Sequence, residues 1–283
     1  MNPRAPMQYL ALLVVVALLG GCGSEKPSGP FDPAGSTGTA NASPNASGST
    51  GRIRGIVRFQ GSPPAPATDA ITADQNVCGT GVSLPRLALG KDNGVRHAFV
   101  YLEGVKATGD FRPQQSLLID QRDCQYVPHA MTIAPGAKIE ITNSDPILHN
   151  VHAKIPTEDG LQTVFNIAQA KRGDRTPVGS PFTKPGIVHL SCEAGHPWMS
   201  AYVFVADHPF VAITNEHGEF VIEGVPPGKH TIKMWHEGVT LLRNLKSLQR
   251  YEYEEPYEAT QEVVVEAGAE AVIDFSFSLR SSS

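Results

Sequence analysis

Long stretches with the 3.6-residue period of amphipathic helices are scarce in this sequence, whereas Val, Ile, Thr, Gly and Pro are plentiful. This scarcity favours an all-β fold over a helical one. A basic patch is also lacking, because the formal net charge of -5 is spread along the chain, so we expect no nucleic-acid partner. No pattern of residues indicates a catalytic pocket, which favours a carrier or binding protein over an enzyme. At 283 residues and 41% hydrophobic content, the chain can still bury the cores of one or two domains.

Cysteine is equally sparse, and the first of the four, Cys22, lies just after an apolar run over residues 10–19. Arg4 precedes the run and two glycines follow it, an order that resembles a bacterial lipoprotein signal. We therefore expect residues 1–21 to be removed and Cys22 to carry lipid. The lipid would hold the protein at the membrane of the bacterial cell envelope, on the outer membrane or the periplasmic face. An ordinary secretory signal or a membrane span is the alternative, although the run is short for a bilayer.

Residues 22–50 are rich in Gly, Ser, Pro, Asn and Ala, and this composition predicts a flexible tether. Cys78 and Cys124 would then lie in an oxidising compartment, where a disulfide is the expected state of two otherwise unassigned cysteines. A free buried thiol or an extra metal ligand is the alternative for this pair. Cys192 is left over, and a metal would protect its thiol.

Folded structure is expected from Gly51 onward, with strands where apolar and polar residues alternate. In the strand predicted over residues 187–192, Val188, Leu190 and Cys192 share one face, so the thiol should point towards the core. Two stretches lack this alternation. Residues 154–181 are polar and expected to form a loop, and leucines at helical spacing in residues 239–250 indicate a short amphipathic insertion.

A group of potential metal ligands follows the strand that ends at Cys192. His196 and Met199 come after the cysteine on one short loop, and His149 lies directly after an upstream strand predicted to end at Asn143. One thiolate, two imidazoles and one thioether are the ligand set of a blue-copper site, in which Met takes the weak axial position. The sequence therefore predicts one copper ion bound by these side chains.

Three further side chains near these ligands have open roles. His129 and His152 could supplement the site, but packing or solvent contact explains them as well. Trp198 lies between two predicted ligands, where its ring could cover the metal or anchor a partner protein.

Residues 111–206 resemble a cupredoxin of the plastocyanin and azurin kind. The resemblance rests on Pro135-Gly136 before one strand, the His-Asn-Val element at His149, and Pro185-Gly186 before the cysteine strand. It implies a Greek-key β-sandwich in which His149, Cys192, His196 and Met199 bind one copper ion.

The ligand loop departs from the plastocyanin pattern, because three residues separate Cys192 from His196 and two separate His196 from Met199. This spacing is similar to the last half of the dinuclear copper loop of cytochrome oxidase, where a second cysteine stands four residues earlier. Val188 occupies that position here, so one copper is expected. The departure leaves open whether the centre is an ordinary blue site or a distorted one.

Residues 207–283 resemble a carboxypeptidase regulatory-like domain, an Ig or transthyretin-like β-sandwich. The residues that carry the likeness are Thr214 to Gly218, Phe220, and the Val225-Pro-Pro-Gly228 turn. The opening pattern of that family also occurs at Gly55 to Pro64. We therefore hypothesise that the N-terminal β segment, residues 51–110, contributes to this second sandwich and that the cupredoxin is inserted between its two parts.

The function expected from these features is one-electron transfer by a membrane-anchored copper protein whose redox partners the sequence does not identify. A closed set of four ligands favours a carrier over an enzyme, since redox enzymes need a vacant coordination position. Copper trafficking, storage or sensing is the second possibility, and a metal-free β-sandwich binding module is the third.

Overall fold

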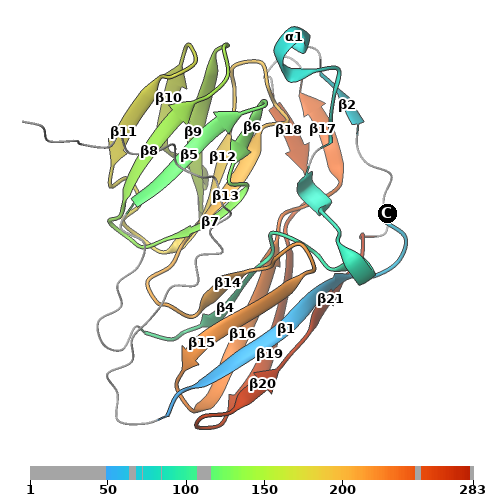
Figure 1. Cartoon of the computed structure of the whole chain (residues 1–283), viewed down its shortest axis with the longest axis vertical. Coiled ribbons are helices and arrows are strands. Elements are labelled where there is room, and N and C mark those ends of the chain that lie inside the picture. The colour runs from blue at the N-terminus through green and yellow to red at the C-terminus, as the bar shows by residue number, and fades with distance from the viewer. Residues whose placement is uncertain are drawn as a thin grey trace, which may run out of the picture. The chain divides into compact units, whose positions relative to one another are not determined.

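Strands make up nearly all of the regular structure in this computed structural model, which confirms the all-β prediction (Figure 1). The structure describes residues 49–63, 68–71, 73–83, 85–106, 116–245 and 250–280. Helical structure in these ranges is limited to α1 (Gln75–Cys78) and the 3-10 turns Pro85–Leu87 and Lys91–Asn93. The expected signal, the lipidated Cys22 and most of the tether lie outside the described residues. Within the described ranges, no helix is long and apolar enough to cross a membrane.

The middle of the chain forms two sheets that share one core. The five-stranded sheet has the order β10 (Gly160–Gln169), β9 (His149–Thr157), β12 (Gly186–Ser191), β13 (Ser200–Val205) and β7 (Ala130–Ile133). The four-stranded sheet has the order β11 (Arg175–Gly179), β8 (Lys138–Asn143), β5 (Ser116–Arg122) and β6 (Gln125–Val127). Ile119 and Ile141 from one sheet pack with Leu190 and Val203 from the other, and all four are fully buried. We call this body the first sandwich.

The cysteine strand runs through the centre of the five-stranded sheet. Val188 and Leu190 are fully buried and Cys192 is 2% exposed, so the predicted core-facing row of β12 is confirmed. The antiparallel register of β12 and β9 places Ser191 opposite His152. The last residues of β12 therefore meet the first residues of β9, where His149 begins the strand.

The second sandwich combines strands from both ends of the described chain. Its first sheet contains β15 (Glu219–Val225), β1 (Gly51–Phe59), β20 (Glu270–Val272) and β21 (Phe275–Phe277), and its second contains β14 (Val211–Ile213), β4 (Phe99–Glu103), β16 (Gly228–His236) and β19 (Tyr257–Val265). Strand β1 pairs with β15, β20 and β21, all of which follow the first sandwich in the sequence. This is the pairing that the insertion hypothesis requires.

Two expectations about irregular segments are wrong. The stretch 154–181 contains the end of β9, all of β10, which pairs with β9, and β11, which pairs with β8. Most of β10 is exposed at the edge of its sheet, and its polar residues face solvent. The sequence therefore lacks the apolar alternation that would predict a strand here. In the described part of the stretch 239–250, β17 (Leu241–Leu245) pairs with β18 (Arg250–Tyr253) instead of forming a helix, and Leu242 is 62% exposed.

The segment around α1 belongs to the first sandwich although the N-terminal β segment was expected to join the second. Ile71 is fully buried in the core of the first sandwich, and Val77 packs against the same core. The short strands β2 (Thr68–Ala70) and β3 (Gly81–Ser83) flank this segment and pair with each other. Cys78 and Cys124 form a disulfide with Cα atoms 5.4 Å apart, as predicted. The segment is thus covalently fixed beside the turn between β5 and β6.

Candidate metal centre

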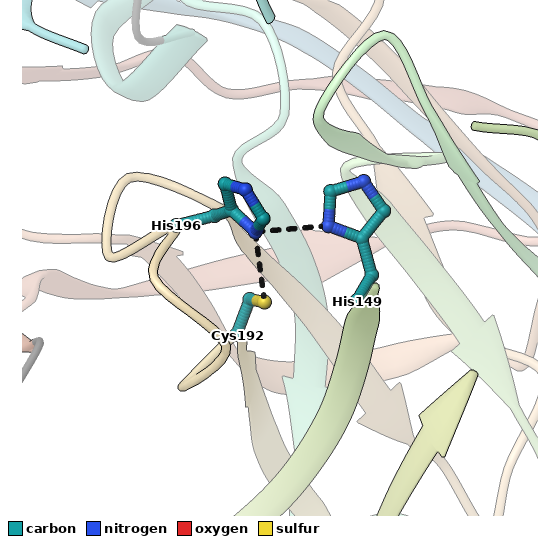
Figure 2. A group of neighbouring side chains, drawn as sticks. All are labelled: His149, Cys192 and His196. Carbon is teal, nitrogen blue, oxygen red and sulfur yellow. Dashed lines mark hydrogen bonds between the residues drawn. The ribbon is translucent and has the colours of Figure 1, made fainter. Parts of the chain in front are cut away.

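Three predicted ligands converge at one end of the five-stranded sheet. The Nδ1 atoms of His149 and His196 lie 3.1 Å apart, and Sγ of Cys192 lies 3.7 Å from Nδ1 of His196 (Figure 2). One ligand atom from each residue lies within 4.8 Å of the others. His149 and His196 have no exposed surface, so the group is closed to bulk water.

The loop that carries two of these ligands is closed by its own backbone. The amide of Cys192 donates to the carbonyl oxygen of Met199 at 3.4 Å, and the amide of Met199 donates to that of His196 at 3.0 Å. Gly195 has a φ of 93°, a backbone conformation that residues with a side chain rarely adopt. Glycine at this position therefore permits the tight turn. The turn brings His196 back over Cys192 and leaves Met199 1% exposed in the same core.

Each imidazole is oriented by a carboxylate on its outer nitrogen. Nε2 of His149 lies 2.9 Å from Oδ2 of Asp145, and Nε2 of His196 lies 2.9 Å from Oδ2 of Asp74. A carboxylate only accepts hydrogen bonds, so both Nε2 atoms must carry the proton. In the neutral rings, both Nδ1 atoms then present lone pairs towards the thiol and towards each other.

That arrangement is unfavourable without a cation, since two lone pairs face each other at 3.1 Å in a buried space. Burial lowers the pKa of His149, and the neighbouring His196 lowers it further. Burial also lowers the pKa of His196, against the opposing influence of Asp74. Both rings therefore favour the neutral form that a metal ion requires.

The thiol of Cys192 contacts Asn150, the residue that follows His149 in the His-Asn-Val element. Oδ1 of Asn150 accepts a contact from the thiol at 3.3 Å and the amide of Glu193 at 2.7 Å. The hydroxyl of Tyr126 donates to the Asn150 carbonyl oxygen. Burial raises the pKa of the Cys192 thiol, although its hydrogen bonds partly offset that effect. The sulfur is thus held in one position in an apolar setting.

The donor set fits one first-row transition metal ion. Such ions bind imidazole nitrogen at about 2.0 Å and thiolate sulfur at about 2.3 Å. The observed separations of 3.1 Å and 3.7 Å are shorter than the sums of two such bonds, and the three ligand atoms lie within 4.8 Å of one another, so the group is compact enough for one shared ion. His149, Cys192 and His196 would hold it, and the buried Met199 ends the same loop. Metal binding by these side chains stays a prediction.

Of the three residues with open roles, His129 and His152 have partners outside this group, whereas Trp198 packs against it. Nε2 of His129 contacts Glu237 of the second sandwich, and His152 contacts Thr163 and Glu193. The ring of Trp198 is 3% exposed and stands edge-on to His196 with centroids 5.3 Å apart, so it covers the site from inside.

Sequence reasoning missed the side chains that orient the ligands. Asp145 lies four residues before His149, and this spacing is the one sequence signal that points to it. Asn150 follows a predicted ligand directly. Asp74 is 122 residues from His196, and no local pattern connects the two.

Comparisons with solved structures found copper proteins that match about a third of this chain. No protein-family model and no curated protein matches the chain. A purple cupredoxin from Nitrosopumilus maritimus matches 31% of this chain and 98% of its own, at 25% identity and a TM-score of 0.27. An auracyanin from Roseiflexus castenholzii matches 34% of this chain and 99% of its own, at 16% identity and a TM-score of 0.29. A copper-containing nitrite reductase from Thermus scotoductus matches 36% of this chain and 24% of its own, at 23% identity and a TM-score of 0.26. These TM-scores lie below 0.5, so the functional argument rests on the side chains of this chain alone.

Proposed function

We propose that the first sandwich binds one copper ion through His149, Cys192, His196 and Met199 and that the protein carries single electrons. One observation carries the proposal: a buried thiol and two imidazole Nδ1 atoms converge while both Nε2 atoms are committed to carboxylates. Soft thiolate and thioether sulfur together with imidazole favour copper over magnesium, calcium or manganese. When bound, copper supplies a centre that gains or loses one electron.

Burial and fixed geometry favour a carrier over a delivery protein. The three converging side chains are at most 2% exposed, and their ligand atoms lie within 4.8 Å of one another. A ligand set that needs little movement lowers the reorganisation that accompanies a change of charge. A site built for handing over copper would expose at least one ligand to the acceptor.

The proposal includes attachment to the bacterial cell envelope. It is supported by the order of residues around Cys22, where an apolar run and two glycines precede the cysteine. The tether of residues 22–50 would let the sandwiches stand about 30 Å from the membrane. Mass spectrometry of the purified chain should find acyl groups on Cys22, and an unmodified or uncleaved N-terminus would contradict the anchor.

The first prediction concerns the Cys192 thiol. Adding Cu(II) to the full chain in detergent should produce an intense visible band from thiolate-to-copper charge transfer, and Cys192→Ser should abolish it. His152→Gln is the matched control, because this histidine lies near the site without joining it, and it should keep the band. Reversible reduction of the coloured protein would support electron transfer. Absence of a band, with copper lost to mild chelators, would instead favour trafficking or a metal-free module.

A further inference from the structure

We infer that Asp74, held by the Cys78–Cys124 disulfide, is a positioning residue for His196 and sets how firmly the site retains its metal. The inference rests on the proposed copper site, but it concerns a segment outside the ligand loop. Asp74 lies in the connection between β2 and α1, and the disulfide closes four residues later. We call residues 71 and 73–78 the clasp.

The side chain of Asp74 contacts His196 instead of capping α1. It occupies the N-cap of α1, where aspartate usually accepts an amide hydrogen bond worth about 1 kcal/mol. Here the side chain makes no such bond, and the backbone adopts a φ of 50°. A residue in the left-handed region that also forgoes its cap is unfavourable locally and therefore needs support from its surroundings. Its carboxylate instead lies 2.9 Å from Nε2 of His196.

The clasp has the anchors needed to support that conformation. Ile71 is fully buried in the core of the first sandwich, and Val77 packs against the same core. The backbone oxygen of Asp74 accepts the amides of Val77 and Cys78 at 2.8 and 2.9 Å. Ala73 lies against the ligand loop, because a Cβ added to Gly195 would stand 3.6 Å from the Ala73 methyl group. The backbone is therefore anchored on both sides of Asp74.

The disulfide is also connected to the residue that orients the other imidazole, that of His149. The amides of Asp123 and Cys124 each donate to Asp145 at 2.9 Å, and Asp145 is the partner of His149. Nε1 of Trp198 donates to the carbonyl oxygen of Cys124 at 3.1 Å. One cystine thus joins the turn that holds Asp145 to the clasp that holds Asp74.

The clasp covers the side of the site that would otherwise meet solvent. The side chain of Asp74 is 42% exposed, whereas that of His196 beneath it has no exposed surface. Without the carboxylate the ring can change tautomer, which puts a proton on Nδ1, or rotate, which moves Nδ1 away; in both cases Nδ1 no longer offers a lone pair to the site. Outer partners of this kind typically affect metal affinity by 10–100-fold.

The first test needs no metal. Nitrogen chemical shifts of the histidine side chains in the metal-free full chain should report a proton on Nε2 of His196. Asp74→Ala should convert this signal to a mixture of tautomers, while Asp159→Ala, an exposed aspartate in the β9–β10 turn, should leave it unchanged. An unaltered His196 tautomer in Asp74→Ala would overturn the positioning role. This test holds even if the parent chain binds no copper, an outcome that would defeat only the proposed function.

The second test measures the rate at which the copper-loaded chain loses its ion to a chelator. Asp74→Ala should speed the loss by about 10–100-fold, and Asp74→Asn, which keeps an acceptor oxygen, should have a smaller effect. The pair Cys78→Ser with Cys124→Ser should behave like Asp74→Ala, with little further effect when all three are combined. Parent-like loss in Asp74→Ala would contradict the inference, and fully additive effects would show that the disulfide acts independently of Asp74. Amide spectra of each variant check that the fold is intact.

Discussion

The two imidazoles of the metal centre use their nitrogens for different tasks. Nδ1 of each ring faces the thiol, and Nε2 of each ring is held by a carboxylate, Asp145 for His149 and Asp74 for His196. A carboxylate on the outer nitrogen fixes the tautomer and makes the inner nitrogen a stronger donor. These two aspartates would therefore influence a bound metal ion without touching it.

The second prediction concerns Met199, the fourth expected ligand. Met199→Leu should retain copper, because an axial thioether bond is long and weak. The swap nearly conserves volume in a buried position, so stability should fall by less than about 1.5 kcal/mol. The visible band should persist at a shifted wavelength, measured together with the copper content.

The matched control is Met131→Leu, another buried methionine in the same core, which should leave the band where it is. Complete loss of copper in Met199→Leu, equal to that in Cys192→Ser, would show that the thioether is a principal ligand.

The side chains that converge at the candidate centre can be found from the sequence because they obey local rules. Cys192 stands in the apolar row of a strand, and His196 and Met199 follow within one loop. Asp74 obeys no such rule, since only the disulfide and the burial of Ile71 bring it to the site. Contacts of this kind depend on the tertiary fold, and a single sequence does not encode them in any readable spacing.

Strands differ in how clearly their sequence predicts them, and β12 and β10, which both pair with β9, show why. In β12, burial of one face demands apolar residues at every second position, so Val188 and Leu190 reveal the strand. Strand β10 lies at the sheet edge with β9 as its sheet neighbour. Backbone hydrogen bonds to β9 hold this strand in the sheet, and its exposed side chains can be polar. For this reason its sequence predicts a loop, although the segment is a strand.

The third prediction concerns β1, the strand that joins the two ends of the chain. A Cβ on Gly55 would stand 1.7 Å from the carbonyl oxygen of Ile273, so the two backbones pack too closely for any side chain. Gly55→Ala should therefore lower the free energy of unfolding by about 1–3 kcal/mol or more, because the strands must separate. Urea unfolding of the metal-free chain measures this.

Gly104→Ala is the comparison, since its φ is 71° and no atom lies within 4 Å of an added Cβ. It should cost about 1 kcal/mol from backbone conformation alone. A smaller loss for Gly55→Ala than for Gly104→Ala would contradict the close packing of β1.

At the scale of the whole molecule, buried charges connect the two sandwiches. Glu237, which follows β16, pairs with Arg86 and with His129, which follows β6. Burial alone would raise the pKa of Glu237, but Arg86 and His129 hold it at about 2. A small apolar cluster lies beside them, in which Phe99 and Trp235 of the second sandwich pack with Phe204 of the first. Because one charged group binds residues of both bodies, the contact should respond to pH.

The last prediction is that acid destabilises the metal-free chain well above the range in which carboxylates titrate. Burial lowers the pKa of His97 and His189 to about 3 and that of His236 to about 4. In the unfolded chain the pKa of a histidine is about 6.5. Between pH 6.5 and about 4, these histidines therefore bind protons in the unfolded chain but not in the folded chain. As a result, the free energy of unfolding falls as the pH falls. Each histidine contributes at most about 1.4 kcal/mol per pH unit to this slope.

Urea unfolding of the metal-free chain at a series of pH values separates these histidines from the exposed ones. His97→Asn should flatten the slope by up to one histidine's share, because asparagine tolerates the φ of 70° that His97 adopts and cannot take up the proton. His217→Gln, at an exposed turn position, should leave the slope as it is. A slope that begins only below about pH 4.5 would mean that carboxylates such as Glu237 account for acid unfolding. In that case the buried histidines would be protonated in the folded protein, and the contact between the sandwiches would tolerate their charge.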